Sequence, residues 1–328
     1  MEKSFRMELA GRSLIVETGK MAKQASGAVL VRYGETVVLV TSTASKEARE
    51  GMDFFPLTVD YEEKMYAVGK MPGGFLRREG RPGNSAILNA RLIDRPIRPL
   101  FDKRCRNDIH VMATVLSVDY DNAPELCGML GASASLGISD IPWDGPIAGV
   151  RVGCVDGQFV INPTQEQLKV STLNITVAGS ETAILMVEGG AQEAPEEDVL
   201  DAIMFGHETI KELVAFQKKI IEEVGKSKRT LIFPEIPEEI KNAIYAYAER
   251  PLKEAIFNPD KLTREAHMEE VRKEAEAHFK EIYPENGSDI AECLNHLTKE
   301  IVRHMISVDK IRPDGRALDE IRPISLSL

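Results

Sequence analysis

The stretch AVLVRYGETVVLVT, residues 28–41, carries two runs of apolar and β-branched residues separated by Tyr33-Gly34-Glu35. Such runs favour strands, and a glycine-centred break between them is typical of a tight turn. The stretch therefore predicts a β-hairpin.

Strand and helix patterns flank this hairpin. Residues 55–62 alternate apolar and polar side chains, with the period of a half-buried strand. A cap at Asn84 or Ser85 predicts a helix that runs to Asp94 and stops before Pro96. Further strands are expected at 12–17, 111–119, 147–152, 173–178 and 183–187. This mixture predicts an α+β domain.

Residues 124–138 predict a helix rich in small side chains, opened by Pro124. Small residues let a helix approach a sheet or another helix closely, so this helix is expected in the core. Its GMLG tetrad, residues 128–131, shares letters with a nucleotide-clamping KH loop. The tetrad lies in an apolar run without flanking positive charge, which favours the core interpretation.

Helical patterns dominate after residue 195. Residues 195–224 predict one helix ended by Gly225, and a linker marked by Pro234 and Pro237 leads to a wholly helical segment. We expect a first domain at 1–225, an all-helical domain with its linker at 226–310, and the first strand of another domain at 311–328. That arrangement predicts the N-terminal part of a longer protein.

Composition bounds the class of protein. The 328 residues are 43% hydrophobic and 28% charged, which is typical of a globular chain. Neither a secretory leader nor a membrane span is expected, because no sufficiently long apolar run occurs. The four cysteines are scattered without a CxxC pair, which predicts free thiols and a cytoplasmic location.

Positive charge is concentrated in one region of an acidic chain. The net charge is -11, so a polyanion requires a local basic site. Residues 70–106 contain ten bases against three acids, a net of about +7. The bases are Lys70, Arg77, Arg78, Arg81, Arg91, Arg95, Arg98, Lys103, Arg104 and Arg106.

Three of these arginines lie in GGFLRREGRPG, residues 73–83, whose glycines and prolines predict an exposed loop. An aromatic ring beside arginines is a combination that holds single-stranded nucleic acid: the ring stacks on a base and guanidinium groups pair with phosphates. The loop residues expected to bind single-stranded nucleic acid in this way are Phe75, Arg77, Arg78 and Arg81.

The following helix extends the basic region. Arg91 and Arg95 are four residues apart on one face, and Arg98 follows Pro96. The alternative to polyanion binding is a solvated loop beside a helix end fixed by Arg91–Asp94 and Asp94–Arg98 ion pairs. Asp94 orients its arginine neighbours under either interpretation.

Other catalytic patterns are missing from the sequence. It contains neither GxxxxGK[ST] nor a strand-linked GxGxxG, which disfavours a nucleotide-using metabolic enzyme. The six histidines are dispersed without HExxH, so they are not expected to bind metal. Asp119 and Asp121 are expected in an exposed turn rather than as a catalytic carboxylate pair.

Residues 53–101, which contain FFPLTV, GRPG and ARLIDRPIRPLF, closely resemble the bacterial polynucleotide phosphorylase family. The resemblance also covers residues 145–162, Phe205-Gly206-His207-Glu208 and residues 312–316. It implies a first RNase-PH-like (βαβα) core domain, an all-helical domain and then a second RNase-PH-like domain.

The resemblance also implies processive 3′→5′ phosphorolysis of RNA. Inorganic phosphate is the co-substrate, Mg²⁺ or Mn²⁺ assists, and the phosphate and metal sites belong to the second core domain, outside this sequence. Single-stranded RNA is the expected partner, in a homotrimer whose three loops surround one pore, with further partners in RNA degradation. This chain by itself is expected to be catalytically inactive.

Matching to the family assigns the loop, together with Arg91, Arg95 and Arg98, to the RNA path. Leu76 replaces the second aromatic residue of the family's loop, which leaves Phe75 as the expected stacking residue. The alternative function is a non-catalytic RNase-PH-like protein that binds RNA or serves as a scaffold.

Overall fold

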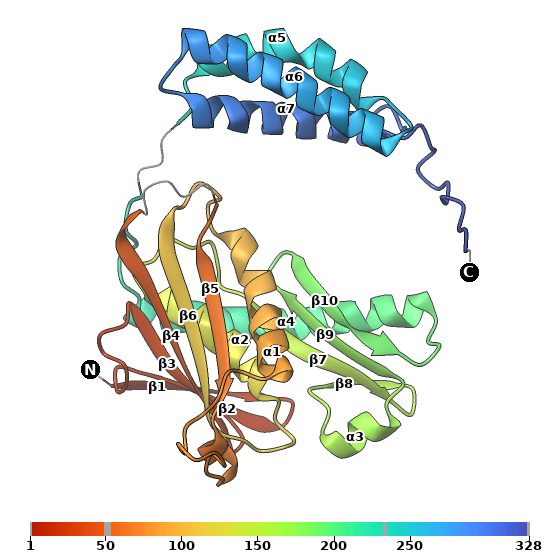
Figure 1. The fold of residues 1–328 in the computed structure, drawn as a ribbon. Coiled ribbons are helices and arrows are strands. Elements are labelled where there is room, and N and C mark those ends of the chain that lie inside the picture. The colour runs from red at the N-terminus through yellow and green to blue at the C-terminus, as the bar shows by residue number, and fades with distance from the viewer. Residues whose placement is uncertain (1, 49–53, 232–234, 327–328) are drawn as a thin grey trace. The chain divides into compact units, whose positions relative to one another are not determined.

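The computed structural model describes residues 2–48, 54–231 and 235–326. The chain divides into two compact units, Met1–Phe233 and Pro234–Leu328. Each unit, drawn as a ribbon in Figure 1, has its own cluster of buried apolar side chains. The first unit is the mixed α+β domain and the second is helical.

A six-stranded sheet forms one half of the first unit. Its strands are β1 (Lys3–Leu9), β2 (Arg12–Thr18), β3 (Gly27–Tyr33), β4 (Thr36–Ala48), β5 (Leu57–Glu63) and β6 (Asn107–Ser117). They lie in the order β1-β2-β3-β4-β6-β5, and only the β5–β6 pair is parallel. A parallel pair needs a crossover, so the chain between β5 and β6 must travel back along the sheet.

That crossover contains the basic region of the sequence. It comprises the 3₁₀ turn η1 (Met65–Val68), the loop 73–83, helix α1 (Asn84–Ile97) and the 3₁₀ turn η2 (Arg98–Leu100). The loop therefore follows the carboxyl end of β5 and precedes the N-terminus of α1. Helix α1 packs against β5.

The predicted hairpin is confirmed as β3 and β4, which pair from Gly27↔Ser42 to Tyr33↔Thr36. Gly34 takes a left-handed φ of 58° in the turn, where glycine is favoured. The alternation along β3 buries Val29, Val31 and Tyr33 on one face. Helix α2 (Pro124–Ile138) covers this sheet by packing against β3 and β4.

Helix α2 has the predicted bounds, and its residues from Leu126 to Ile138 are all buried. Close packing depends on glycine on both sides of the contact. A Cβ on Gly131 would meet Val40 Cγ2 at 2.4 Å, and one on Gly27 of β3 would meet the backbone oxygen of Ser135 at 2.0 Å. The core interpretation of the GMLG tetrad is confirmed.

A second, four-stranded sheet completes the first unit. Its strands are β7 (Ala148–Val155), β8 (Gln158–Ile161), β9 (Leu173–Gly179) and β10 (Ile184–Ala191), in the order β10-β9-β7-β8. Helix α4 (Glu196–Val224) packs against β7 and β9, and the short α3 (Gln165–Val170) follows β8. Helix α2 also contacts β7 and α4, which places it between the two sheets.

The structure corrects the predicted ends of α1. The helix continues through Pro96 to Ile97, and Gly83 rather than Asn84 or Ser85 is its N-cap residue, without a side-chain cap. Proline removes only its own N–H bond in the last turn, and the Arg98 N–H still donates to the Asp94 carbonyl.

Other corrections come from pairing between segments distant in sequence. Strand β6 begins at Asn107 because β4 extends to Ala48, which pairs with Asn107. Strands β1 and β8 and helix α3 were missed. Strand β1 alternates charged and apolar residues without a β-branched run, and it is stabilised by pairing with β2 along its whole length.

The segment after α4 is anchored to the first unit. Lys228 Nζ donates to the Leu136, Gly137 and Ser139 carbonyls at the end of α2, at 2.8–2.9 Å. Arg229 pairs with Asp140 at 2.6 Å. The three Lys228 bonds satisfy carbonyls at a helix C-terminus, where intrahelical partners are missing. A domain boundary at residues 225 and 226 stays a prediction.

The second unit is a three-helix arrangement of α5 (Glu238–Ile256), α6 (Lys261–Ile282) and α7 (Gly287–Ser307). Its core includes Ile244, Leu252, Phe279, Leu294 and Leu297. In residues 311–326 the structure has an isolated bridge between Ile311 and Ala317 and no strand. The strand expected there would need a neighbour to accept its backbone hydrogen bonds. The assignment of residues 311–328 to a further domain stays a prediction.

No helix in the described ranges combines the length and the apolar character that a membrane crossing requires.

Candidate RNA-binding site

The loop 73–83 presents its tip to solvent. The backbone turns at Gly74–Arg77, where the Arg77 N–H donates to the Gly74 carbonyl at 2.9 Å. Arg77 takes a left-handed φ of 47°. The Phe75 side chain is fully exposed, at 102% of its reference area, and Leu76 is 74% exposed. No core contact explains this aromatic ring, which leaves both of its faces open to a ligand.

The arginines of the loop are free of carboxylate partners among the described residues. Arg77, Arg78 and Arg81 are exposed, and the structure gives their guanidinium groups no ion pair within those residues. The single acid of the loop is occupied elsewhere: Glu79 accepts a hydrogen bond from the Met65 N–H at 2.9 Å. That bond ties the loop to the first residue of η1.

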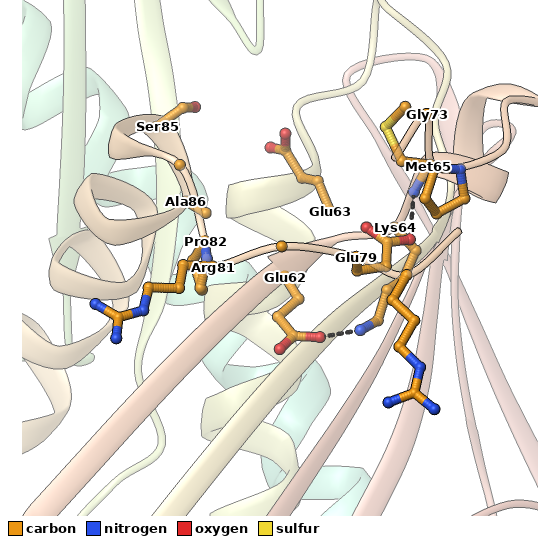
Figure 2. A pocket seen from close by; sticks show the side chains of 14 residues that line it. Glu62, Glu63, Lys64, Met65, Gly73, Glu79, Arg81, Pro82, Ser85 and Ala86 are labelled. Carbon is orange, nitrogen blue, oxygen red and sulfur yellow. Dashed lines mark hydrogen bonds and ion pairs between the residues drawn. The ribbon is translucent and has the colours of Figure 1, made fainter. Parts of the chain in front are cut away.

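A cavity of about 360 Å³ lies at the base of the loop, between the end of β5, η1 and the start of α1 (Figure 2). We call it the loop-base cavity. Its charged lining residues are Glu62, Glu63, Lys64, Arg78, Glu79 and Arg81. Three acids balance three bases, so the cavity itself is close to neutral although the loop above it is cationic.

Helix α1 continues the basic surface. Arg91 and Arg95 are exposed on one face, as predicted, together with Ile87 and Leu88. Arg95 forms an ion pair with Glu188 of β10 at 2.9 Å. Arg91 lines a separate cavity of about 180 Å³ whose other lining residues include Asp60, Tyr61 and Asp94.

Arg98 is committed within the protein. Its guanidinium donates to both carboxylate oxygens of Asp94 at 2.9–3.1 Å and to the Leu57 carbonyl at 3.0 Å. It also lies over the Phe55 ring, 5.8 Å from the centroid. The expected orienting role of Asp94 is confirmed for Arg98, whereas the structure contains no Arg91–Asp94 ion pair. RNA contact by Arg91, Arg95 and Arg98 stays a prediction.

Two other groups have structural roles. Burial opposes ionisation of Asp119, but hydrogen bonds from Asp121, Asn122 and Glu35 outweigh it and lower the pKa of this carboxyl. This network closes the predicted turn. His207 is buried and bonds through Nε2 to the Ser180 carbonyl at 3.0 Å.

The sequence reasoning missed the carboxylates beneath the arginine loop. The charge balance of residues 70–106 does not include Glu62 and Glu63, which end β5 and line the loop-base cavity. A consecutive Glu-Glu-Lys at the end of a predicted strand was the available signal. Glu62 and Glu63 belong to the site only because the crossover brings the loop back to the end of β5.

Comparison with known proteins identifies the class. Residues 10–142 match the model for domain 1 of the 3′ exoribonuclease family, and residues 145–209 match the model for domain 2. The crystal structure of rice (Oryza sativa) Rrp46 superposes with a TM-score of 0.50 at 14% identity, over 67% of this chain and 94% of that chain. The first unit is therefore an RNase PH-like 3′ exoribonuclease fold.

The helical unit narrows this class to one family. Residues 239–317 match the model for the polyribonucleotide nucleotidyltransferase RNA-binding domain. The polyribonucleotide nucleotidyltransferases of Heliobacterium modesticaldum and Syntrophomonas wolfei are each 57% identical, over 99% and 98% of this chain and 46% of their own length. The chain belongs to the polyribonucleotide nucleotidyltransferase family, and it spans about half the length of these relatives.

Proposed function

We propose that this chain supplies the RNA entrance of a phosphate-dependent 3′→5′ exoribonuclease. The observation that carries the proposal is the loop 73–83, where Arg77, Arg78 and Arg81 have no acid partner in the described residues and stand beside a fully exposed Phe75. Such a loop in a chain of net charge -11 concentrates attraction for a polyanion at one place.

The chemistry of the loop suits single-stranded RNA. Arginine forks contact phosphate oxygens in pairs, and an exposed ring stacks on any base, so the grip is strong and independent of sequence. A processive enzyme requires this kind of contact, because the strand must move through it after each cleavage. Arg91 and Arg95, on the exposed face of α1, would extend the same path.

We infer a homotrimer in which three copies of the loop surround one pore. Family membership and the exposed position of the loop support this assembly, as they support partners in RNA degradation. A cytoplasmic location is also proposed. It is supported by four free cysteines, of which Cys127 has a pKa raised by burial to about 12 and is therefore unreactive.

The resident metal and the co-substrate phosphate belong to the proposed reaction. Among the described residues, no group of three or more His, Cys, Asp or Glu is placed to hold a metal ion. From the family resemblance, we propose that Mg²⁺ or Mn²⁺ and inorganic phosphate bind in the second RNase-PH-like core domain.

The 328-residue chain alone should release no ADP from poly(A) in the presence of inorganic phosphate and Mg²⁺. The reason is that the proposed phosphate and metal ligands lie outside this sequence. ADP is measured by chromatography against a vector-only preparation. Phosphate-dependent release of ADP above that background would contradict the proposal that the phosphate and metal ligands lie in the second core domain.

Photocross-linking tests where RNA binds. A single-stranded RNA containing 4-thiouridine should cross-link to peptides covering residues 73–83. A second candidate site is the helical unit, because its family model is described as an RNA-binding domain. Its 17 acids and 11 bases between residues 235 and 310 disfavour a polyanion. Cross-links confined to residues 239–317 would favour that unit and refute the loop proposal.

A further inference from the structure

One carboxylate of the loop-base cavity, that of Glu63, is bonded to neither a cation nor a backbone N–H among the described residues. The other two acids of the cavity are engaged: Glu62 pairs with Lys64, and Glu79 accepts from the Met65 N–H. The Tyr61 hydroxyl donates to Glu63 Oε1 at 3.1 Å. Within the described residues, its Oε2 has no hydrogen-bond partner. In Figure 2 this carboxylate stands between Ala86 and Met65.

Tyr61 fixes the direction of the Glu63 carboxylate. The tyrosine ring is 1% exposed, and burial, reinforced by the charge of Glu63, raises the pKa of its hydroxyl. The hydroxyl therefore keeps its proton and donates steadily to Oε1. Since an ionised carboxylate only accepts, Glu63 offers the cavity acceptor positions and no donor.

The charge pattern selects a neutral ligand with donors for the interior. With Arg78 and Arg81 at the rim, the charged groups left for the interior are three carboxylates and Lys64, so a phosphate is disfavoured there. Arg81 points away from Glu63, toward the outside of the cavity (Figure 2). Phosphates are thus attracted to the rim, while the interior has a volume of about 360 Å³ and apolar surfaces from Met65, Pro82 and Ala86. Such a volume suits a small planar group.

We propose that the loop-base cavity binds one nucleobase of the RNA strand, with guanine preferred because its N1–H and N2–H donate to the Glu63 carboxylate. This inference rests on the proposed passage of RNA over the loop 73–83. The flanking phosphates bind Arg78 and Arg81 at the rim. The entrance therefore slows or holds the strand at guanosines, in addition to gripping it without regard to sequence.

The Watson–Crick edges of the bases explain the preference. Guanine presents two adjacent donors, which match the two oxygens of a carboxylate. Adenine and cytosine each present one amino group beside an acceptor, and uracil presents one N–H between two carbonyl oxygens that Glu63 would repel. A bidentate contact of this kind discriminates between bases by about 5-fold or more.

The test uses the intact chain and three labelled RNA octamers at low salt. One octamer is all uridine, one carries a single central guanosine, and one carries inosine there, which lacks the 2-amino group. The guanosine octamer should bind about 5- to 10-fold more tightly than the uridine octamer, and inosine should lose most of this gain. Glu63→Gln should reduce the preference below about twofold, because its amide donor faces the guanine donors.

Two controls separate the possible outcomes. Glu197→Gln removes the same charge from an exposed position on α4 and should keep the guanosine preference. Equal binding of all three octamers by the parent, or a preference that survives Glu63→Gln, would overturn the base site and leave the loop's RNA binding standing. If no octamer binds at all, the proposed function fails, and the base site fails with it.

Discussion

Replacing Arg77, Arg78 and Arg81 together by alanine should weaken single-stranded RNA binding by about 100-fold at about 0.1 M salt. Each phosphate contact on a single strand contributes about 0.7 to the slope of log K against log salt. Three lost contacts therefore flatten the slope by about two units. Because the slopes differ, the ratio of the parent's affinity to the variant's affinity grows as the salt concentration falls. Fluorescence anisotropy titrations at several salt concentrations measure both quantities.

The Phe75→Ala variant separates stacking from charge. Its affinity should fall by about 1–3 kcal/mol while the salt slope stays the same, since no phosphate contact is lost.

A matched control for the triple arginine variant is the triple Lys20→Ala, Lys23→Ala, Lys46→Ala variant, which removes equal charge from exposed positions of the same unit. Parent-like affinity and slope in the arginine variant would show that the loop is only a solvated surface.

Melting curves check that these effects come from the site. Residues 73–83 include no buried side chain, so all of these variants should unfold at the temperature of the parent. Titrations also need the oligomeric state to be measured, because three loops in one assembly would raise the apparent affinity through multivalency.

Gly27→Ala should destabilise the first unit by about 2–3 kcal/mol and leave the helical unit unchanged. The added Cβ would lie 2.0 Å from the backbone oxygen of Ser135 and 3.0 Å from Ser42 Oγ. A backbone atom in the last turn of α2 has no alternative rotamer, so the helix must move away from the sheet. The melting temperature of the unit should fall by about 5–10 °C.

Calorimetry of the intact chain can resolve this effect, because the two units have separate cores. The matched control is Gly80→Ala in the loop, where an added Cβ meets nothing within 4 Å. It should melt like the parent. A Gly27→Ala chain with two parent-like transitions would mean that the contact between α2 and β3 is not as close as the structure shows.

Local signals accounted for much of the fold. The hairpin at residues 28–41 had β-branched runs on both sides of a glycine, and α2 had a proline start and a continuous apolar run; both formed as predicted. Strand β1 carried no such signal. Its formation depends on backbone hydrogen bonds to β2. The residues of a strand do not indicate where its pairing partner lies.

The candidate site divides in the same way. Residue types and spacing were enough to mark the loop 73–83 as an exposed, cationic, aromatic segment. They did not distinguish the arginines from one another. Arg98 is held by Asp94 and the Leu57 carbonyl, and Arg95 by Glu188, whose strand lies more than 90 residues later in the chain.

Composition and periodicity over short windows were enough to predict the hairpin, the buried helix and the helical unit, and to locate the concentration of positive charge. Which arginines have acid partners, and the position of Glu63 at the base of the arginine loop, depend on the tertiary fold. The crossover between the parallel strands β5 and β6 brings the loop 73–83 back to the end of β5, the strand that precedes it. Charged residues that are separated in the sequence become neighbours only through this path of the chain.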